Sequence, residues 1–164
     1  MKRKPPAPDK ASVREALLAA MKSALESAVR AAEDARAGAT HAENRSEGDK
    51  DMRATEQSYL ARGQAIRVEE LAEQIQRLEA MQLSPARDAI GAGALVRLTV
   101  DDEPRLFFVV PFGGGTELVV GGAKITVVAP VSPVGAALVG RAVGDAFELR
   151  ARGALREWIV ESID

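Results

Sequence analysis

Residues 131–145 of the chain read VSPVGAALVGRAVGD, and each residue type in this stretch suits one position of a compact turn. Ser132 can cap the start of a helix, and Pro133 fits the first helical position, where a missing N–H costs nothing. The short apolar run that follows supplies one or two helical turns before Gly140 offers a left-handed stop. The Gly-Asp pair at the end is typical of a turn into another strand. The stretch therefore predicts a short helix between two strands of a sheet.

Strand-like runs surround this turn after Gly91, and Gly, Pro and Asp residues separate them. Trp158 alternates with Arg156 and Val160 in the last run, which predicts that the indole lies in the core. A small antiparallel sheet with one short helix fits this order of elements. The expected strands are residues 94–100, 105–110, 116–120, 124–129, 146–150 and 156–162.

The first half of the chain has a helical pattern, because Ala, Leu, Glu, Arg and Met dominate it and Pro is absent between residues 9 and 84. Apolar residues recur there at alternating steps of three and four, which is typical of a coiled-coil seam. A loop at about residues 38–51 can reverse the chain, so the two seams predict an antiparallel helical hairpin. The seams are Leu18, Met21, Leu25, Ala28, Ala32 and Ala35 on the first helix, and Ala61, Gln64, Val68, Leu71, Ile75 and Leu78 on the second.

The expected chain is therefore of the α+β class, with a disordered tail at residues 1–9, a coiled-coil hairpin at 10–84 and a β domain at 90–164. We expect a monomer, because both seams can be satisfied within one chain. The basic start of the sequence leads into prolines instead of an apolar core, and no run approaches the length of a membrane span. These features predict a cytoplasmic protein with no membrane partner.

Composition excludes several classes of function. Lys and Arg number 22 against 24 Asp and Glu, and the net charge of −2 disfavours direct, non-specific binding of nucleic acid. The chain has no Cys and a single His, which rules out thiol chemistry, disulfides and a His/Cys zinc site. No stably bound cofactor and no metal of its own are expected.

The turn at residues 131–145 also has a specific spacing, Ser-Pro-x-Gly-x-Ala-Leu-x-Gly-Arg-x-x-Gly-Asp. This spacing resembles the signature of the C-terminal domain of the Gre family of transcript-cleavage factors (GreA/GreB type). The resemblance implies an FKBP-like fold for residues 90–164 and bacterial RNA polymerase as the partner. In that family the globular domain holds the rim of the polymerase's secondary channel, and the coiled coil enters the channel. The factor is then an accessory of the polymerase active site and not itself an enzyme.

The resemblance also implies which residues of the turn bind polymerase: Ser132, Pro133, Gly135, Arg141 and Asp145. The same residues have simpler structural explanations. Backbone geometry can demand Gly135, and Asp145 can serve its own turn. Arg141 is the best candidate for a direct contact, although it can equally pair with a nearby carboxylate.

The loop of the expected hairpin is acidic. In the Gre family the tip carboxylates help to hold a second Mg²⁺, shared with the polymerase, for cleavage of the 3′ end of backtracked RNA, so contact with RNA is indirect. Aligning the family's Glu-Asn pair on Glu43 and Asn44 places Thr40 where an Asp is usual. Asp49 and Asp51 can supply the lost carboxylate from the other side of the loop. The tip carboxylates expected to assist catalysis are therefore Glu43, Asp49 and Asp51.

Residues 51–64 look like those of a divergent branch of Gre-like proteins. In this segment Arg53, Tyr59 and Arg62 either contact polymerase or brace the base of the loop, and Asn44 supports the tip. With Thr40 at the Asp position, the arm can instead block the channel and inhibit transcription without cleavage. A structural coiled-coil adaptor unrelated to polymerase is a further alternative. A prolyl isomerase is disfavoured, because the β domain has barely enough aromatic residues for a core.

Overall fold

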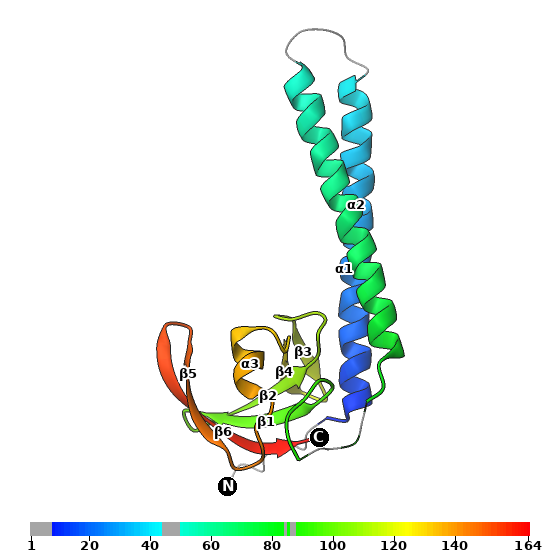
Figure 1. Ribbon diagram of the computed structural model, residues 1–164. Helices are drawn as coiled ribbons and strands as arrows, with labels where there is room; N and C mark the ends of the chain where they lie inside the picture. Colours follow the sequence, from blue (N-terminus) through cyan, green and yellow to red (C-terminus); the bar gives the residue numbers. More distant parts are fainter. Residues whose placement is uncertain (1–7, 44–49, 84, 86–87) are drawn as a thin grey trace. The chain divides into compact units, whose positions relative to one another are not determined.

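The computed structural model describes residues 8–43, 50–83, 85 and 88–164, with only the backbone described for 42, 43, 50 and 51. Two long helices precede a six-stranded sheet that carries one short helix (Figure 1). The chain divides into two compact units. One is the helical hairpin of Leu18–Ala80, and the other is a globular unit made of Met81–Asp164 together with the chain up to Leu17.

The first helix, α1, spans Lys10–Glu43. Asp9 caps it, since its carboxylate accepts a hydrogen bond from the Ser12 N–H at 3.2 Å and its carbonyl accepts from Val13 at 3.1 Å. The helix continues through Gly38, which the sequence placed in the reversing loop, and therefore ends six residues later than expected. Residues 1–7 of the expected tail lie outside the described residues.

The second helix, α2, spans Lys50–Ala80 and runs antiparallel to α1. Lys22 forms an ion pair with Glu79 at 2.7 Å near the base of the hairpin. Farther along, a side chain at Gly38 would overlap the Gln57 amide, so the two backbones approach closely there. The buried seam residues of this unit are Met21, Ala28 and Ala35 on α1, and Leu71, Ile75 and Leu78 on α2.

Leu18, which was predicted to lie on the seam of the first helix, is less buried than its neighbour Leu17. Leu17 is fully buried, whereas Leu18 is only half-buried. Both residues keep a three-or-four spacing to Met21, so the periodicity alone did not separate them. Leu17 and Val13 belong to the part of α1 that clusters with the globular unit, where both are fully buried.

The sheet of the globular unit has the strand order β3-β4-β2-β1-β6-β5. Its strands are β1 (Leu95–Val100), β2 (Glu103–Val109), β3 (Glu117–Val120), β4 (Ala123–Val128), β5 (Ala146–Ala151) and β6 (Ala154–Ile163). The pairs are antiparallel with one exception: β2 and β4 run parallel, because β3 carries the chain to the edge of the sheet and pairs antiparallel with β4. The sheet is therefore mixed and not wholly antiparallel as expected.

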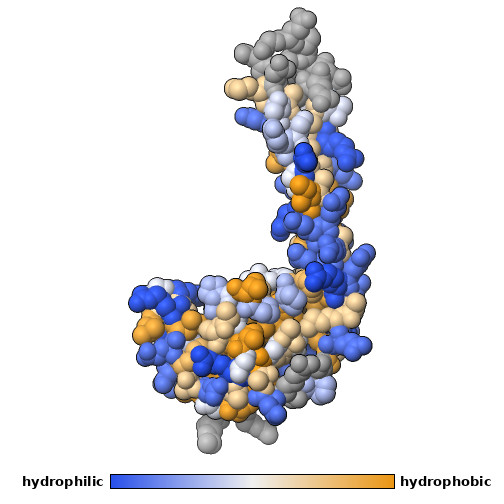
Figure 2. Space-filling model, in the orientation of Figure 1, coloured by the Kyte–Doolittle hydropathy of each residue, from blue (hydrophilic) through white to orange (hydrophobic). Residues whose placement is uncertain are grey.

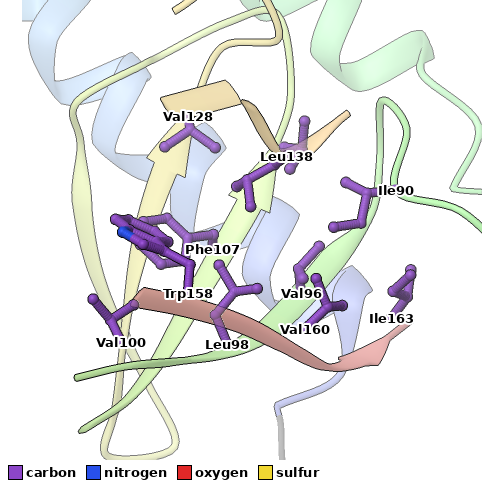
Figure 3. Packing of buried hydrophobic residues seen from close by; sticks show 11 residues of the cluster. Ile90, Val96, Leu98, Val100, Phe107, Val128, Leu138, Trp158, Val160 and Ile163 are labelled. Carbon is purple, nitrogen blue, oxygen red and sulfur yellow. The ribbon is translucent and has the colours of Figure 1, made fainter. Parts of the chain in front are cut away.

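The short helix α3 (Pro133–Leu138) follows β4, and its Leu138 is fully buried in the main hydrophobic cluster. Trp158 on β6 lies in the same cluster and is 4% exposed, which confirms the core position predicted from its alternation (Figure 3). The Phe107 ring is 5.6 Å from the indole, centroid to centroid. The other members, drawn from the sheet and the segment before it, are Ile90, Val96, Leu98, Val100, Val109, Val128, Val160 and Ile163.

The expected fold class is confirmed, with an N-terminal helical hairpin followed by a small β domain carrying one short helix. The two buried aromatic residues named above also bear on the isomerase alternative. Because Phe107 and Trp158 pack inside the cluster, these rings do not line an open pocket for a peptide.

Candidate functional site

The turn at residues 131–145 is built around a capped helix start. Ser132 has an extended backbone (φ −72°, ψ 158°), and its hydroxyl accepts a hydrogen bond from the Gly135 N–H at 3.0 Å. The same hydroxyl donates to the Ala129 carbonyl at 2.8 Å, which ties the cap to the end of the preceding loop. Pro133 occupies the first helical position, as predicted.

Gly135 lies where α3 meets this loop. A Cβ at this position would overlap the carbonyl of Ala129 and lie against Pro130, so no larger residue fits without a backbone shift. The backbone explanation offered for Gly135 from the sequence therefore accounts for the glycine.

After α3 the chain turns through Gly140, whose φ is +86°. The Gly140 N–H donates to the Ile90 carbonyl at 2.8 Å, and the Ile90 N–H donates to the Arg141 carbonyl at 2.8 Å. These two bonds join the turn to the segment that enters β1. The left-handed conformation predicted for Gly140 is therefore present, and it sets the direction in which the backbone continues into Arg141.

The Arg141 side chain is held by a backbone carbonyl and an aromatic ring, and not by an ion pair with a described carboxylate. Its Nε donates to the Ala137 carbonyl at 2.8 Å, and its guanidinium carbon is 3.9 Å from the centre of the Phe147 ring. The Phe147 ring in turn stacks on Trp158, with centroids 6.1 Å apart. A cation over an aromatic face stabilises by about 0.5 to 1 kcal/mol where water reaches it. The Arg141 side chain thus covers the aromatic end of the core.

Asp145 closes the turn as the sequence predicted. Its carboxylate accepts a hydrogen bond from the Ala142 N–H at 2.8 Å, and Gly144 beside it has φ +92°. Backbone bonds from Gly144 to Val160 and from Val160 to Asp145, at 2.8 and 2.9 Å, then attach the turn to β6. The Asp145 carboxylate therefore shapes the turn.

The surface of this turn carries an apolar feature that the sequence analysis did not single out. Val131, Val139 and Val143 are 93%, 43% and 57% exposed, and we call these three residues the valine rim. They bracket α3 in the sequence. Exposed large apolar side chains are candidates for contact with another protein. The signal in the sequence was a valine at each end of the helix and at the following corner.

The residues of the expected acidic tip lie mostly outside the described part of the chain. Asn44 and Asp49 are not described, and neither are the side chains of Glu43 and Asp51. Glu43 is the last residue of α1, and Asp51 is in the first turn of α2. The geometry of the carboxylates therefore stays a prediction.

Thr40, at the position of the family's Asp, is described. Its hydroxyl donates to the Arg36 carbonyl of its own helix at 3.0 Å. Arg53, Tyr59 and Arg62 lie on α2 with exposed side chains. Among the residues with described positions, no group of three or more His, Cys, Asp or Glu side chains is arranged to hold a metal ion.

No helix within the described ranges is both long and apolar enough to cross a membrane.

No protein-family model matches the chain, and no curated protein matches it either. Among solved structures, GreA factor homolog 1 (Gfh1) of Thermus thermophilus is 18% identical over 90% of this chain and 94% of that one, with a TM-score of 0.39. Gfh1 of Thermus aquaticus is 18% identical over 91% and 94%, again with a TM-score of 0.39. The prokaryotic transcription elongation factor GreA/GreB from Nitrosomonas europaea is 19% identical over 57% and 78%, with a TM-score of 0.37. Scores at this level do not establish a common function.

Proposed function

We propose that this chain is an accessory factor of bacterial RNA polymerase that binds through its globular unit, inserts its helical hairpin into the secondary channel and modulates elongation. The observation that supports it most is the turn at residues 131–145. Ser132, Pro133, Gly135, Gly140, Arg141 and Asp145 of its Gre-like signature each have a structural role there, from the Ser132 cap to the Asp145 carboxylate. A chain that joins this turn to a long helical hairpin combines the two parts that the Gre resemblance requires.

In this proposal the valine rim provides the apolar part of the polymerase contact. Its three side chains are exposed, and the backbone beneath them is fixed by the Ser132 cap and by the Gly140 corner. A rigid apolar surface loses little conformational entropy on binding, which favours affinity. Arg141 contributes by bracing the same turn, since its side chain bonds the Ala137 carbonyl of α3 and lies over the Phe147 ring.

The expected tip carboxylates belong to the end of the hairpin where α1 ends and α2 begins. Helices of 34 and 31 residues extend about 50 Å and 46 Å at a rise of 1.5 Å per residue. Glu43 and Asp51 stand at the facing ends of α1 and α2, so both belong to the tip. Carboxylate oxygens are the ligands that Mg²⁺ prefers, and one or two suffice when substrate phosphates and waters complete the shell. Glu43, Asp49 and Asp51 would hold the ion, which stabilises the attacking and leaving oxygens of a phosphodiester.

The test is cleavage of RNA in stalled, backtracked elongation complexes with Mg²⁺ and the full-length protein. We expect RNA to shorten from its 3′ end faster than with polymerase alone. Glu43→Ala and the double variant Asp49→Ala/Asp51→Ala should each lower this stimulation by about tenfold or more while binding to polymerase stays within about twofold. The loss of carboxylate ligands withdraws charge stabilisation by the metal from the transition state, and each ~1.4 kcal/mol lost is a factor of ten in rate. Glu69→Ala, a carboxylate change on the exposed side of α2 away from the tip, is the matched control. Equal stimulation by the wild type and both tip variants would contradict the assignment of the carboxylates.

A second candidate function is inhibition without cleavage, and the Thr40 hydroxyl favours it. That hydroxyl already donates to the Arg36 carbonyl and carries no negative charge, so it is a poor substitute for a carboxylate ligand. In the same assay, a wild-type protein that binds polymerase and slows the intrinsic cleavage would establish this function in place of the first.

A further inference from the structure

The distal part of α2, residues 52–66, exposes large apolar side chains. Met52, Tyr59, Leu60 and Ile66 are 78%, 71%, 53% and 48% exposed. Met52, Tyr59 and Ile66 are seven residues apart, which is close to two helical turns, so these three align along one side of the helix. We call these three residues the outer stripe. In Figure 2 hydrophobic residues are visible on the hairpin surface among hydrophilic ones.

The opposite side of the same segment faces α1 and carries smaller or polar residues. Its half-buried positions are Ala54, Gln57, Ala61, Gln64 and Ala65. Gln57 is close enough to α1 for its amide to touch a Cβ built at Gly38. Large apolar side chains thus point outward in this segment, whereas alanine and glutamine side chains point inward, which differs from an ordinary surface helix with its large apolar residues on the inner side.

Two comparisons show that this reversal is local. In the proximal part of α2, residues 68–80, the large apolar residues Leu71, Ile75 and Leu78 are buried and the charged residues are exposed. Among the side chains of α1 that the structure describes, Val29 is the one exposed large apolar residue, at 36%. The outer stripe therefore marks one side of one helix, and not the hairpin in general.

The surroundings of the outer stripe indicate the chemistry of its partner. Between Tyr59 and Ile66 lies Gly63, where a Cβ would meet nothing within 4 Å, so a side chain of the partner can enter there. Residues 52–66 carry Arg53 and Arg62 against the single acid Glu56, a net charge of +1. A complementary surface is apolar at its centre and bordered by carboxylates.

We propose that the outer stripe docks on a protein surface of this kind, and that the surface is the wall of the polymerase channel that receives the hairpin. This inference rests on the proposed function, because insertion is what brings the distal part of α2 against another protein. It assigns an orientation to the inserted hairpin: α2 contacts the wall with its outer side, and the distal part of α1 does not.

Affinity for purified RNA polymerase tests the proposal, measured with the full-length protein in competition with labelled wild type. Tyr59→Ser and Ile66→Ser should each weaken binding by about fivefold, and the double variant by about tenfold or more, since apolar anchors buried at an interface contribute most of its free energy. Val29→Ser on α1 is the matched control and should change affinity by less than about twofold. Circular dichroism should show unchanged helix content, because all three side chains are exposed.

A crosslinking experiment identifies the partner. The chain has no Cys, so Tyr59→Cys carries a single photo-crosslinker in the polymerase complex. A crosslink to a polymerase polypeptide supports the proposal. A crosslink to RNA, DNA or a second copy of this chain overturns it.

The same measurements separate the inference from the proposed function. A wild type that does not bind polymerase overturns both. If the wild type binds and Val131→Glu/Val139→Glu abolishes binding, while the outer-stripe variants bind like wild type, the proposed function stands and the role of the outer stripe is overturned.

Discussion

At Gly135 the first turn of α3 passes so close to the preceding loop that any side chain would overlap the Ala129 carbonyl. The same loop receives the Ser132 hydroxyl, so the helix start and the loop are fixed to each other at two adjacent points. Gly135 is buried, and its backbone is helical rather than left-handed. The requirement for glycine here is therefore one of space.

We predict that Gly135→Ala lowers the free energy of unfolding of the globular unit by about 2 to 3 kcal/mol, the usual cost of forcing extra atoms into a packed site. Gly91→Ala is the control, because a Cβ there meets nothing within 4 Å and the backbone does not have positive φ. Urea unfolding followed by the fluorescence of the single Trp measures both variants. Equal stability of the two would mean that the Ala129 loop moves aside without cost.

The residues of this turn show what could be predicted from the sequence. The Ser132 cap, the Pro133 position and the Gly140 stop follow from local backbone chemistry, and all three are confirmed. The stacking of Arg141 on Phe147 was not predicted, since it requires the following hairpin to fold back over the turn. Contact with polymerase by any of these residues stays a prediction.

Between the two ends of the hairpin the character of the buried seam changes. Near the base, Leu71, Ile75 and Leu78 of α2 are buried, each removing a large apolar side chain from water. Toward the tip the inward positions are Ala61, Gln64 and others that bury little. Since apolar burial contributes about 25 cal/mol per Å², the distal part of the hairpin is held less strongly than the base.

We expect amide hydrogen exchange to show this gradient. Amides of residues 54–64 should exchange at least about tenfold faster than those of 70–78, because local opening near the tip exposes less apolar surface. Gln64→Leu should slow exchange in the distal segment, and Gln76→Leu, an equivalent change at an exposed position, should not. Uniform protection along α2 would contradict the gradient.

The same helix shows where periodicity is insufficient. Ala61, Gln64 and Val68 were predicted to face α1, and all three are half-buried as expected. Tyr59 and Ile66 keep an equally regular spacing and are larger, yet they face outward. Sequence pattern identifies stripes on a helix, but the register of the partner helix decides which stripe is covered.

The chain divides into two compact units. The single Trp, Trp158, lies in the core of the globular unit, whereas most helical residues belong to α1 and α2. Trp fluorescence therefore reports the globular unit, and far-ultraviolet circular dichroism reports mainly the hairpin. Two compact units of one chain need not unfold in one transition.

We predict that Ile75→Ala, which removes a buried side chain of the hairpin, lowers the midpoint of the circular dichroism transition more than that of the fluorescence transition. The cost is about 2 to 4 kcal/mol for a buried Ile reduced to Ala. Val160→Ala in the globular core should have the reverse effect. Two variants that shift both transitions equally would show that the chain unfolds as one cooperative body.

For the whole chain, the fold class and the order of the hairpin and the β domain could be predicted from the sequence, because helix-forming residues dominate the first half and strand-like runs the second. The parallel pairing of β2 with β4 did not, because which strands become neighbours depends on contacts remote in sequence. The positions of the Glu43, Asp49 and Asp51 carboxylates stay a prediction, because those side chains lie outside the described part of the chain.

The position of β1 has a consequence for biosynthesis. This first strand lies between β2 and β6, so one of its two edges stays unpaired until the final strand has left the ribosome. The hairpin needs only residues made earlier and can form while translation continues. During synthesis the nascent chain thus carries a finished arm and an open sheet, and chaperones that shield exposed strand edges would act on the globular unit alone.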